Sequence, residues 1–191
     1  MTTAEIHTKL KAQFGERIGA LSEEATPACV IETGAIAAVC EWLRDEPGID
    51  LTSLMCLSAV DVDGKLGVVY HLHSMQHKHQ IALKVELTDR DHPHVPTVST
   101  LFGTADWHER EAFDMMGIVF DGHGDLRRIL CPEDWEGWPL RKDYVVQEYY
   151  RGLRVRYPEG KNADRGHWVS RDVPDLRVDP PEIQEPDLKG M

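Results

Sequence analysis

Four histidines fall within nine residues of sequence, at His71, His73, His77 and His79. Imidazole nitrogens are common metal ligands, and alternate residues of a strand share a face, so His71 and His73 could meet His79 of a neighbouring strand around a metal ion. No carboxylate is placed as an obvious third ligand or as an acceptor that would orient the imidazoles. We therefore favour the simpler interpretation, in which these side chains are solvated at the end of a hairpin.

Carboxylates and histidines also recur through one predicted helix and the turn after it: Asp106, His108, Glu109, Glu111, Asp114, His123 and Asp125. Paired carboxylates can act as acid and base or bind a divalent cation. The same spacing predicts ion pairs along the helix, from Asp106 to Arg110 and from Arg110 to Asp114. We expect these pairs to occupy the carboxylates, which favours a structural role for the helix over a catalytic one.

Residues 107–144 are unusually rich in tryptophan and contain two pairs of adjacent basic residues. Trp and Arg are the side chains most enriched at interface hot spots, and the guanidinium groups of Arg127 and Arg141 are suited to bidentate pairing with a partner's carboxylates. The alternative is that Trp135 and Trp138 fold back on the body of the chain while the arginines balance its acidity. The residues alone leave both interpretations open.

Composition excludes several classes of protein. The 191 residues carry a formal net charge of −12, which disfavours general nucleic-acid binding because neutralising phosphates requires an excess of Lys and Arg. The four cysteines form no CxxC pair, so zinc-ribbon and iron–sulfur spacings are absent. Reduced thiols are typical of the cytosol, and no segment reaches the roughly 18 apolar residues of a membrane span. We expect a soluble chain without a direct membrane span.

The elements that position these residues can be predicted from apolar periodicity and from capping and turn residues. Helices are predicted over 3–18, from about 36 until Pro47–Gly48, and over 104–116 with Gly117 after the last turn. Strands are predicted over 28–32, 51–62, 66–73, 81–87 and 118–120, with Asp63–Gly64 closing a hairpin. This order predicts an α+β fold, a mostly antiparallel sheet covered by helices on one face.

Charge and proline divide the chain. The excess of acidic side chains lies before residue 127, whereas residues 127–171 carry more basic than acidic side chains. Most of the prolines follow residue 131, and proline disfavours long helices. We therefore predict an α+β body over 1–126, followed over 127–191 by an interface segment and an extended Pro-rich C-terminal arm.

The segment 107–144 contains, in order, Glu109-Arg110-Glu111, Asp125-Leu126-Arg127-Arg128 and Pro139-Leu140-Arg141-Lys142-Asp143-Tyr144. With these motifs it closely resembles the hallmark of one family, the 30-kDa-type (C) subunit of the proton-translocating NADH:quinone oxidoreductase, respiratory complex I. One departure is Gly124, where the family usually has proline, which loosens the loop before Asp125. The residues that carry the resemblance, and that it marks as a partner interface, are Glu109, Arg110, Glu111, Asp114, Gly117, His123, Asp125, Arg127, Arg128, Trp135, Pro139, Arg141, Lys142, Asp143 and Tyr144.

The resemblance implies a non-catalytic structural subunit of the hydrophilic arm of that complex, at the cytoplasmic face of the bacterial inner membrane. It implies no cofactor, metal or catalytic residue in this chain. FMN, iron–sulfur clusters and quinone would belong to partner subunits, and the chain would pack against the hydrogenase-like large subunit and the neighbouring iron–sulfur subunits. The complex transfers electrons from NADH to quinone and couples this to proton translocation.

Two alternatives remain at this point. Equivalent subunits occur in membrane-bound hydrogenases and in related complexes with other electron donors, and this chain alone does not identify the donor. A more remote interpretation is a free-standing metal-dependent enzyme that uses the histidines of 71–79 or the carboxylates of 109–125.

Overall fold

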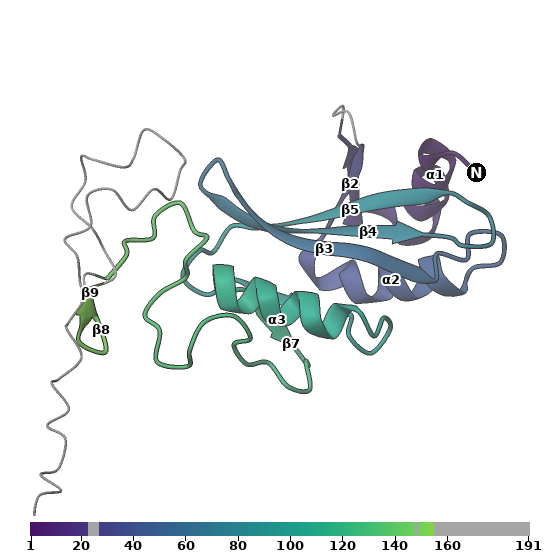
Figure 1. Cartoon of the computed structure of the whole chain (residues 1–191). Coiled ribbons are helices and arrows are strands. Elements are labelled where there is room, and N and C mark those ends of the chain that lie inside the picture. Colours follow the sequence, from purple (N-terminus) through teal and green to yellow (C-terminus); the bar gives the residue numbers. More distant parts are fainter. Residues whose placement is uncertain (23–26, 148, 155–191) are drawn as a thin grey trace, which may run out of the picture. The chain divides into compact units, whose positions relative to one another are not determined.

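The computed structural model of the chain describes residues 1–22, 27–147 and 149–154 (Figure 1). Two compact units are distinguished, Met1–Val145 and a second that begins at Val146. The first unit thus extends to Val145, beyond the body predicted over 1–126. In the second unit, strands β8 (Tyr149–Tyr150) and β9 (Leu153–Arg154) form an antiparallel pair. The predicted Pro-rich arm beyond residue 154 lies outside the described residues.

A five-stranded sheet of order β1-β2-β5-β4-β3 forms the centre of the first unit. Strands β3 (Ser53–Val62), β4 (Lys65–His73) and β5 (Gln80–Leu87) are antiparallel neighbours. Strand β2 (Ala28–Ile31) pairs with β5 in parallel, and β1 (Ile18–Leu21) lies antiparallel to β2 at the edge. The turn between β3 and β4 has positive φ at both Asp63 and Gly64, as a two-residue hairpin turn requires. The predicted mostly antiparallel α+β fold is therefore confirmed.

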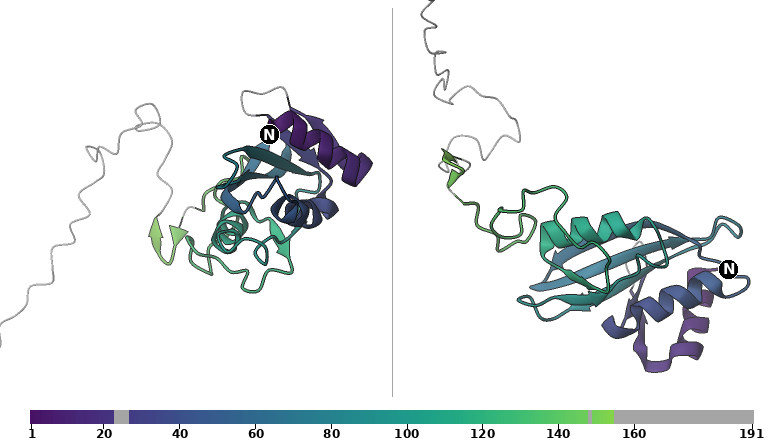
Figure 2. Two further views of the ribbon diagram at one scale, coloured as in Figure 1. Left: turned by 90° about the vertical axis from the view of Figure 1, so that its right-hand side faces the viewer. Right: turned by 90° about the horizontal axis from the view of Figure 1, so that it is seen from below.

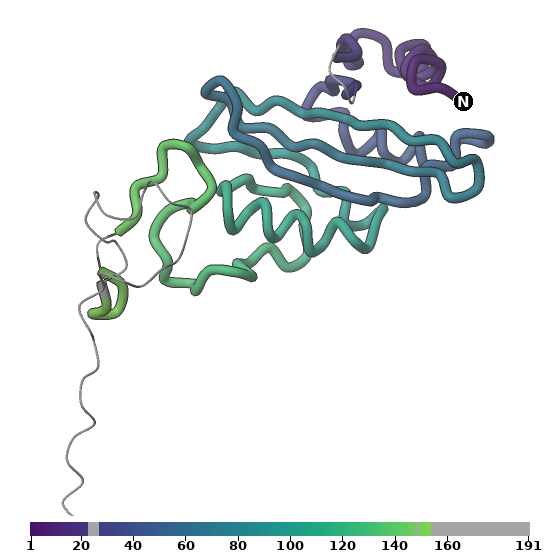
Figure 3. The backbone as a smooth tube through the Cα atoms, turned by 45° about the horizontal axis from the view of Figure 1, so that its top comes forward, coloured from purple at the N-terminus to yellow at the C-terminus, as the bar shows by residue number. Residues whose placement is uncertain are grey.

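Helices α2 (Ile36–Asp45) and α3 (Ala105–Met116) lie beside each other on one face of the sheet (Figures 1 and 2). Helix α1 (Thr3–Phe14) lies near the β1 edge, apart from α3 (Figure 3). A capping box between Thr2 and Glu5 begins this helix. The helix ends earlier than the predicted residue 18, because Gly15 has a φ of 62° and a short 3₁₀ turn, Gly15–Arg17, leads into β1. None of the helices in the described part of the chain is long and apolar enough to span a bilayer.

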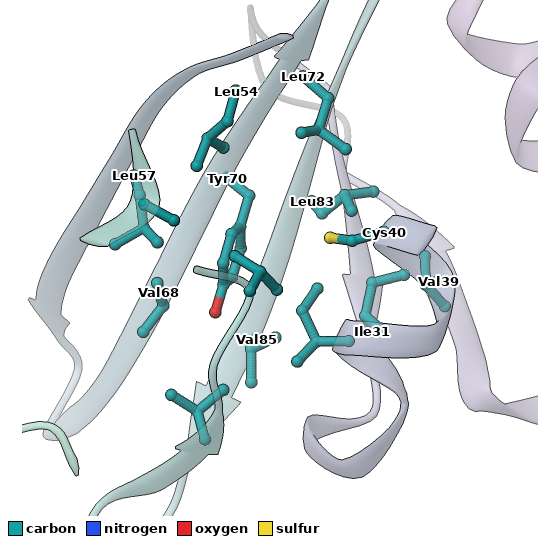
Figure 4. Packing of buried hydrophobic residues seen from close by; sticks show 14 of the residues in the cluster. Ile31, Val39, Cys40, Leu54, Leu57, Val68, Tyr70, Leu72, Leu83 and Val85 are labelled. Atoms are coloured by element: carbon teal, nitrogen blue, oxygen red, sulfur yellow. The ribbon is translucent and has the colours of Figure 1, made fainter. Parts of the chain in front are cut away.

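The hydrophobic core fills the space between the sheet and α2 and α3. Alternate residues of β4 and β5 face the helices, as period-2 patterning requires; they are Leu66, Val68, Tyr70, Leu72, Ile81, Leu83, Val85 and Leu87. From α2 they meet Val39 and Cys40, which lie close to Leu83 and Ile31 in Figure 4. The Tyr70 hydroxyl is also buried here, without a hydrogen-bond partner in the described chain.

A second, two-stranded sheet leads into the region that carries the family resemblance. Strand β6 (His94–Pro96), where no strand was predicted, pairs in parallel with β7 (Val119–Asp121), which follows α3. Another 3₁₀ turn, Thr33–Ala35, precedes α2. Beyond β7 the chain runs without regular secondary structure to the end of the first unit, beside α3 (Figure 3). We call residues 127–145 the anchored segment, for the contacts described next.

Candidate partner interface

Asp114 holds the beginning of the anchored segment. Its Oδ2 accepts hydrogen bonds from the backbone N–H groups of Ile129 (3.0 Å), Leu130 (2.6 Å) and Cys131 (2.8 Å), and its Oδ1 accepts one from Arg128 Nη1 (2.8 Å). Burial by itself would raise the pKa of Asp114, but these donors stabilise the carboxylate and hold its pKa below the usual value. A fully buried carboxylate thus serves as the binding site for three successive peptide groups.

This arrangement corrects the predicted ion pairs of the helix. The pair from Asp106 to Arg110 is present at 4.0 Å. The predicted pair from Arg110 to Asp114 was wrong, because Asp114 instead bonds Arg128 and the backbone of the anchored segment. The carboxylates have partners, as expected, but Asp114 finds its partners in the anchored segment and not in its own helix.

Arg128 and Trp138 fasten the middle of the segment. While Arg128 Nη1 binds Asp114, its Nη2 donates to the carbonyl of Gly137 at 3.0 Å. The guanidinium lies 4.7 Å from the centre of the Trp138 ring, a cation–π arrangement. Trp138 covers Gly117, where a Cβ would come within 2.6 Å of indole Cδ2. Gly117 is therefore required twice, for its φ of 69° at the end of α3 and for the space that Trp138 fills.

For Arg141, pairing with carboxylates of a partner was one of two open interpretations; in this structure it binds carbonyl groups of its own chain. Its Nε donates to Met116 O (2.6 Å) at the C-terminus of α3, and its Nη1 donates to Arg90 O (2.9 Å). Burial lowers the pKa of its guanidinium. The nearby N–H of Leu140 donates to Met115 O (3.1 Å). The last carbonyls of α3, which no residue of the helix can satisfy, are thus satisfied by the anchored segment.

The end of the segment is tied to the sheet through Asp61 of β3. Arg90 makes two hydrogen bonds to the Asp61 carboxylate, at 2.7 and 3.0 Å, and a further ion pair to Asp143 at 3.0 Å. The backbone N–H of Lys142 also donates to Asp61. The Arg90 bonds and the Lys142 N–H lower the pKa of Asp61 to about 2.

Sequence reasoning did not single out Asp61 or Arg90. A signal was present for Asp61, since it occupies the same alternating phase of its strand as the buried Leu57. A carboxylate in the buried phase of a strand requires a partner.

Glu109 and His123 form an interior group under α3. Glu109 is fully buried and accepts hydrogen bonds from Val98 N (2.8 Å) and the Thr97 hydroxyl. Burial raises the pKa of Glu109. The buried side chain of His123 lies 3.3 Å from an Asp106 carboxylate oxygen and 3.9 Å from Glu109. The group contains the residue types of an acid–base pair, but its polar atoms face the protein's own backbone and side chains.

The remaining predicted site residues divide between bonded and exposed positions. Trp135 Nε1 donates to the Tyr144 hydroxyl at 3.0 Å. Arg127 is exposed and bonds Asp125 through Nε. The side chains of Glu111 and Lys142 are exposed, and Pro139 is partly buried. The geometry thus brings together most of the predicted set, chiefly as bonds within the chain.

The histidines of 71–79 do not form a metal site in this structure. Among the described residues, no group of three or more His, Cys, Asp or Glu side chains is placed to hold a metal ion. His77 pairs with Asp50 (2.8 Å) and stacks on His79, whose Nε2 bonds Ile49 O (2.7 Å). His79 is buried, so the prediction that all of these histidines are solvated was wrong for this residue.

Two shallow hollows of about 170 and 100 Å³ occur in the described part of the chain. The larger is lined by residues such as Met55, His71 and Gln80, and the smaller by residues of the β3–β4 turn. Both are below the roughly 300–1,000 Å³ of typical ligand pockets. None of the α3 carboxylates lines either of them.

Residues 29–150 match the model of the family described as the respiratory-chain NADH dehydrogenase, 30 Kd subunit. The chain belongs to this family. The match takes in nearly all of the first unit after β1, including α3 and the whole anchored segment.

Relatives support the same assignment. The NADH-quinone oxidoreductase C subunit of Chloroherpeton thalassium is 46% identical over 152 residues, which cover 78% of this chain and 63% of that protein. The protein of the same name from Chlorobium phaeobacteroides is 46% identical over 153 residues, 78% of this chain and 92% of that protein. The chain thus spans less than two thirds of the first of these relatives and nearly all of the second.

A solved structure shares the fold. It is a chain from the structure of the membrane-bound sulfane sulfur reductase, an archaeal respiratory membrane complex. It is 22% identical, with a TM-score of 0.55, and the likeness covers 83% of this chain and 96% of that chain. At this identity the comparison shows the fold alone.

Proposed function

We propose that this chain is a non-catalytic structural subunit of the hydrophilic arm of an NADH:quinone oxidoreductase. The observation that carries the proposal is the family match over 29–150. Within that range, charged side chains of the kind that enzymes use for catalysis bind the chain's own backbone, as Asp114 and Arg141 do. Such a chain contributes a shaped and rigid surface to an assembly.

The electron carriers of the complex, FMN, iron–sulfur clusters and quinone, belong to partner subunits in this proposal. Burial raises the pKa of Cys29 to about 11 and that of Cys40 to about 12. Burial also raises the pKa of Cys131. Iron–sulfur clusters are bound by several cysteines gathered at one place, and in the described ranges no group of three or more Cys, His, Asp or Glu side chains is placed to hold a metal ion. This supports a role for these cysteines in packing.

The proposed partners are the hydrogenase-like large subunit that helps to form the quinone site and the neighbouring iron–sulfur subunits. Residues 127–191 supply the main contact in this proposal, with the anchored segment as its described part. The chain would reach the cytoplasmic face of the bacterial inner membrane through the complex, and alone it would have no activity.

Affinity purification tests the proposal. The tagged full-length chain is purified from detergent-solubilised membranes of its own host, and the associated chains are identified by mass spectrometry. We expect a flavoprotein that oxidises NADH, the iron–sulfur subunits and the large subunit, together with NADH:quinone reductase activity. Purification of the chain by itself would contradict the proposal. Recovery with a hydrogenase module but no flavoprotein would favour the equivalent subunit of a related complex with another donor.

A further inference from the structure

Within residues 29–150, charged side chains such as Asp61 and Asp114 are buried and hold the chain together, whereas several large apolar side chains are exposed. Trp107, Leu130 and Leu140 are 62%, 63% and 59% exposed. Single exposed apolar residues are ordinary, but a rigid group of large ones marks an interaction site. The contacts of these three residues show that they are held in place and lie near one another.

Leu130 and Leu140 have fixed backbones under exposed side chains. Leu130 N–H is bonded to Asp114 and Leu140 N–H to Met115 O. A single guanidinium, that of Arg128, bonds both Asp114 and Gly137 O, so the stretches that carry the two leucines lie side by side. Because the backbone under these side chains is already ordered, a partner that binds them does not have to order it.

Trp107 belongs to the same surface by helical geometry. Residues 107, 111 and 114 follow the i, i+4, i+7 spacing that places them on one face of α3. Asp114, on that face, accepts a hydrogen bond from the backbone N–H of Leu130. Glu111, which lies between Trp107 and Asp114 on the helix, is exposed. The indole of Trp107 is steadied by Arg110, whose guanidinium lies 4.9 Å from the ring centre.

The free charge on this surface is negative. Glu111, Glu133 and Glu136 are exposed and make no ion pair within 4 Å among the described residues, although the charge of Glu133 helps to raise the pKa of Arg127. The last two lie in the turn between the fixed stretches 129–131 and 137–140. The nearby cations are engaged: Arg128 by Asp114 and Arg127 by Asp125.

Three further cations, Arg110, Arg141 and Lys142, belong to the same part of the chain. Arg110 is buried between Asp106 and Asp125, and Arg141 binds carbonyl groups. The exposed Lys142 lies near Asp61, whose pKa its charge helps to lower. The arginines of this part of the chain are therefore engaged by groups of the same chain, whereas Lys142 is exposed.

We propose that Trp107, Glu111, Leu130, Glu133, Glu136 and Leu140 form a docking surface for a protein partner that presents an apolar pocket rimmed by Lys and Arg. This rests on the proposed function and reverses the polarity of one interpretation of the sequence, in which arginines of this chain would meet carboxylates of the partner. Complementary charge selects partners and disfavours wrong ones. A second copy of this chain is a poor occupant because the same glutamates would face each other across a two-fold interface.

Competition for incorporation tests the surface. Untagged wild-type chain and a tagged full-length variant are expressed together in the native host, the complex is isolated through a partner subunit, and mass spectrometry gives the ratio of the two chains. Dividing by their ratio in the whole lysate removes differences in synthesis and turnover. We expect Leu130→Asp/Leu140→Asp to compete about tenfold less well than wild type, the scale of one hot-spot pair. The matched control, Met75→Asp, alters a 69% exposed side chain in the β4–β5 turn and should stay within about twofold.

The charge of the partner is tested with Glu133 and Glu136, whose side chains make no hydrogen bond or ion pair within the described part of the chain. We expect Glu133→Lys/Glu136→Lys to compete about tenfold less well. Glu16→Lys/Glu41→Lys changes the net charge equally at exposed positions elsewhere and should have a much smaller effect. Better incorporation of Glu133→Lys/Glu136→Lys, or wild-type behaviour of Leu130→Asp/Leu140→Asp, would overturn the proposal.

A photo-crosslinking amino acid at position 136 identifies the occupant. A crosslink to a Lys- or Arg-containing peptide of another subunit supports the proposal. A crosslink to residues 155–191 of this chain or to a second copy overturns it. Failure of the proposed function would be distinct, because the wild-type chain would then bring down no flavoprotein or iron–sulfur subunit.

Discussion

The body of the chain and the anchored segment are held by different forces. In the body, strands β4 and β5 bury alternate apolar residues against α2 and α3, so the free energy of folding there is spread over many side chains. The anchored segment buries few large side chains, and a small number of charged groups, chiefly Asp114, Arg128, Arg141 and Asp61, fix its backbone. Removal of one apolar side chain should therefore weaken the body only in part, whereas removal of one of these charged groups should detach the anchored segment.

Asp114→Ala is expected to have the largest effect. It leaves three backbone N–H groups and the Arg128 guanidinium without their acceptor, and breaking such a buried pair costs about 3–5 kcal/mol. We expect the anchored segment to detach while the sheet persists. Hydrogen exchange measures this directly: the amides of 129–131 should exchange orders of magnitude faster, with β5 little changed. Equal loss of protection in both would contradict the comparison. Asp114→Asn keeps one acceptor oxygen, so its amide exchange rates at 129–131 should lie between those of wild type and those of Asp114→Ala.

Leu83→Ala tests the body. Leu83 is fully buried in the centre of the sheet, and truncation of a buried leucine costs about 2–5 kcal/mol. The loss should lower the urea midpoint of the whole first unit, because the cavity lies in the shared core. Leu153→Ala, at a 72% exposed position in the second unit, is the matched control and should leave that midpoint unchanged. A loss of stability confined to the anchored segment would contradict this prediction.

Gly117→Ala separates backbone strain from crowding by Trp138. A Cβ at 117 meets both the positive φ and the indole, with Cδ2 at 2.6 Å, and we expect a loss of about 2–4 kcal/mol in stability. In a Trp138→Ala background only the φ cost of about 1 kcal/mol should remain. The double-mutant cycle, measured by urea denaturation, should therefore give a clear coupling energy. Strict additivity would mean that Trp138 moves away without cost.

Acid should loosen the end of the segment. The pKa of Asp61 is lowered from its ordinary 3.8 to about 2 by Arg90 and the Lys142 N–H. Its contribution is therefore complete above about pH 4–5 and is lost as the pH falls toward 2. Glu109 has the opposite sign, since burial raises its pKa and favours the neutral form. Stability measured from pH 5 to 2 should fall less steeply in Asp61→Asn than in wild type. Parallel curves would contradict this account.

Tyr70→Phe should have the smallest effect. The hydroxyl is buried without a hydrogen-bond partner among the described residues, so removing it deletes a desolvated polar group and no bond. We expect a change between zero and about 1 kcal/mol in the stabilising direction. A loss above about 1 kcal/mol in the urea midpoint analysis would show that the hydroxyl has a partner after all.

The sequence was sufficient for elements with strong periodicity or a clear end signal. The alternation in β5 and the glycine after α3 placed those elements within a residue or two, and the α+β class followed. Short strands such as β1 and β6 were missed, because three or four residues carry too little periodicity and their pairing depends on distant chain. The parallel pairing of β2 with β5 is tertiary information of the same kind.

The sequence singled out the region of the candidate site, but it did not show which bonds its charged side chains make. The density of Trp, Arg and carboxylates marked residues 107–144, yet helical spacing could not show that Asp114 would prefer three peptide N–H groups to Arg110. Helical spacing predicts partners only about one turn away on the same helix, whereas a buried carboxylate is bonded by donors from any part of the chain that the fold brings close to it. The engagement of Arg141 with carbonyls was hidden for the same reason.

The position of the segment's anchors also has a consequence for the order of assembly. Asp61, Arg90, Asp114 and the carbonyls of Met115 and Met116 all precede residues 127–145 in the chain. During synthesis every docking point on the body has therefore left the ribosome before the piece that binds it. The segment can close last, as a latch on a unit whose sheet and helices are already in place.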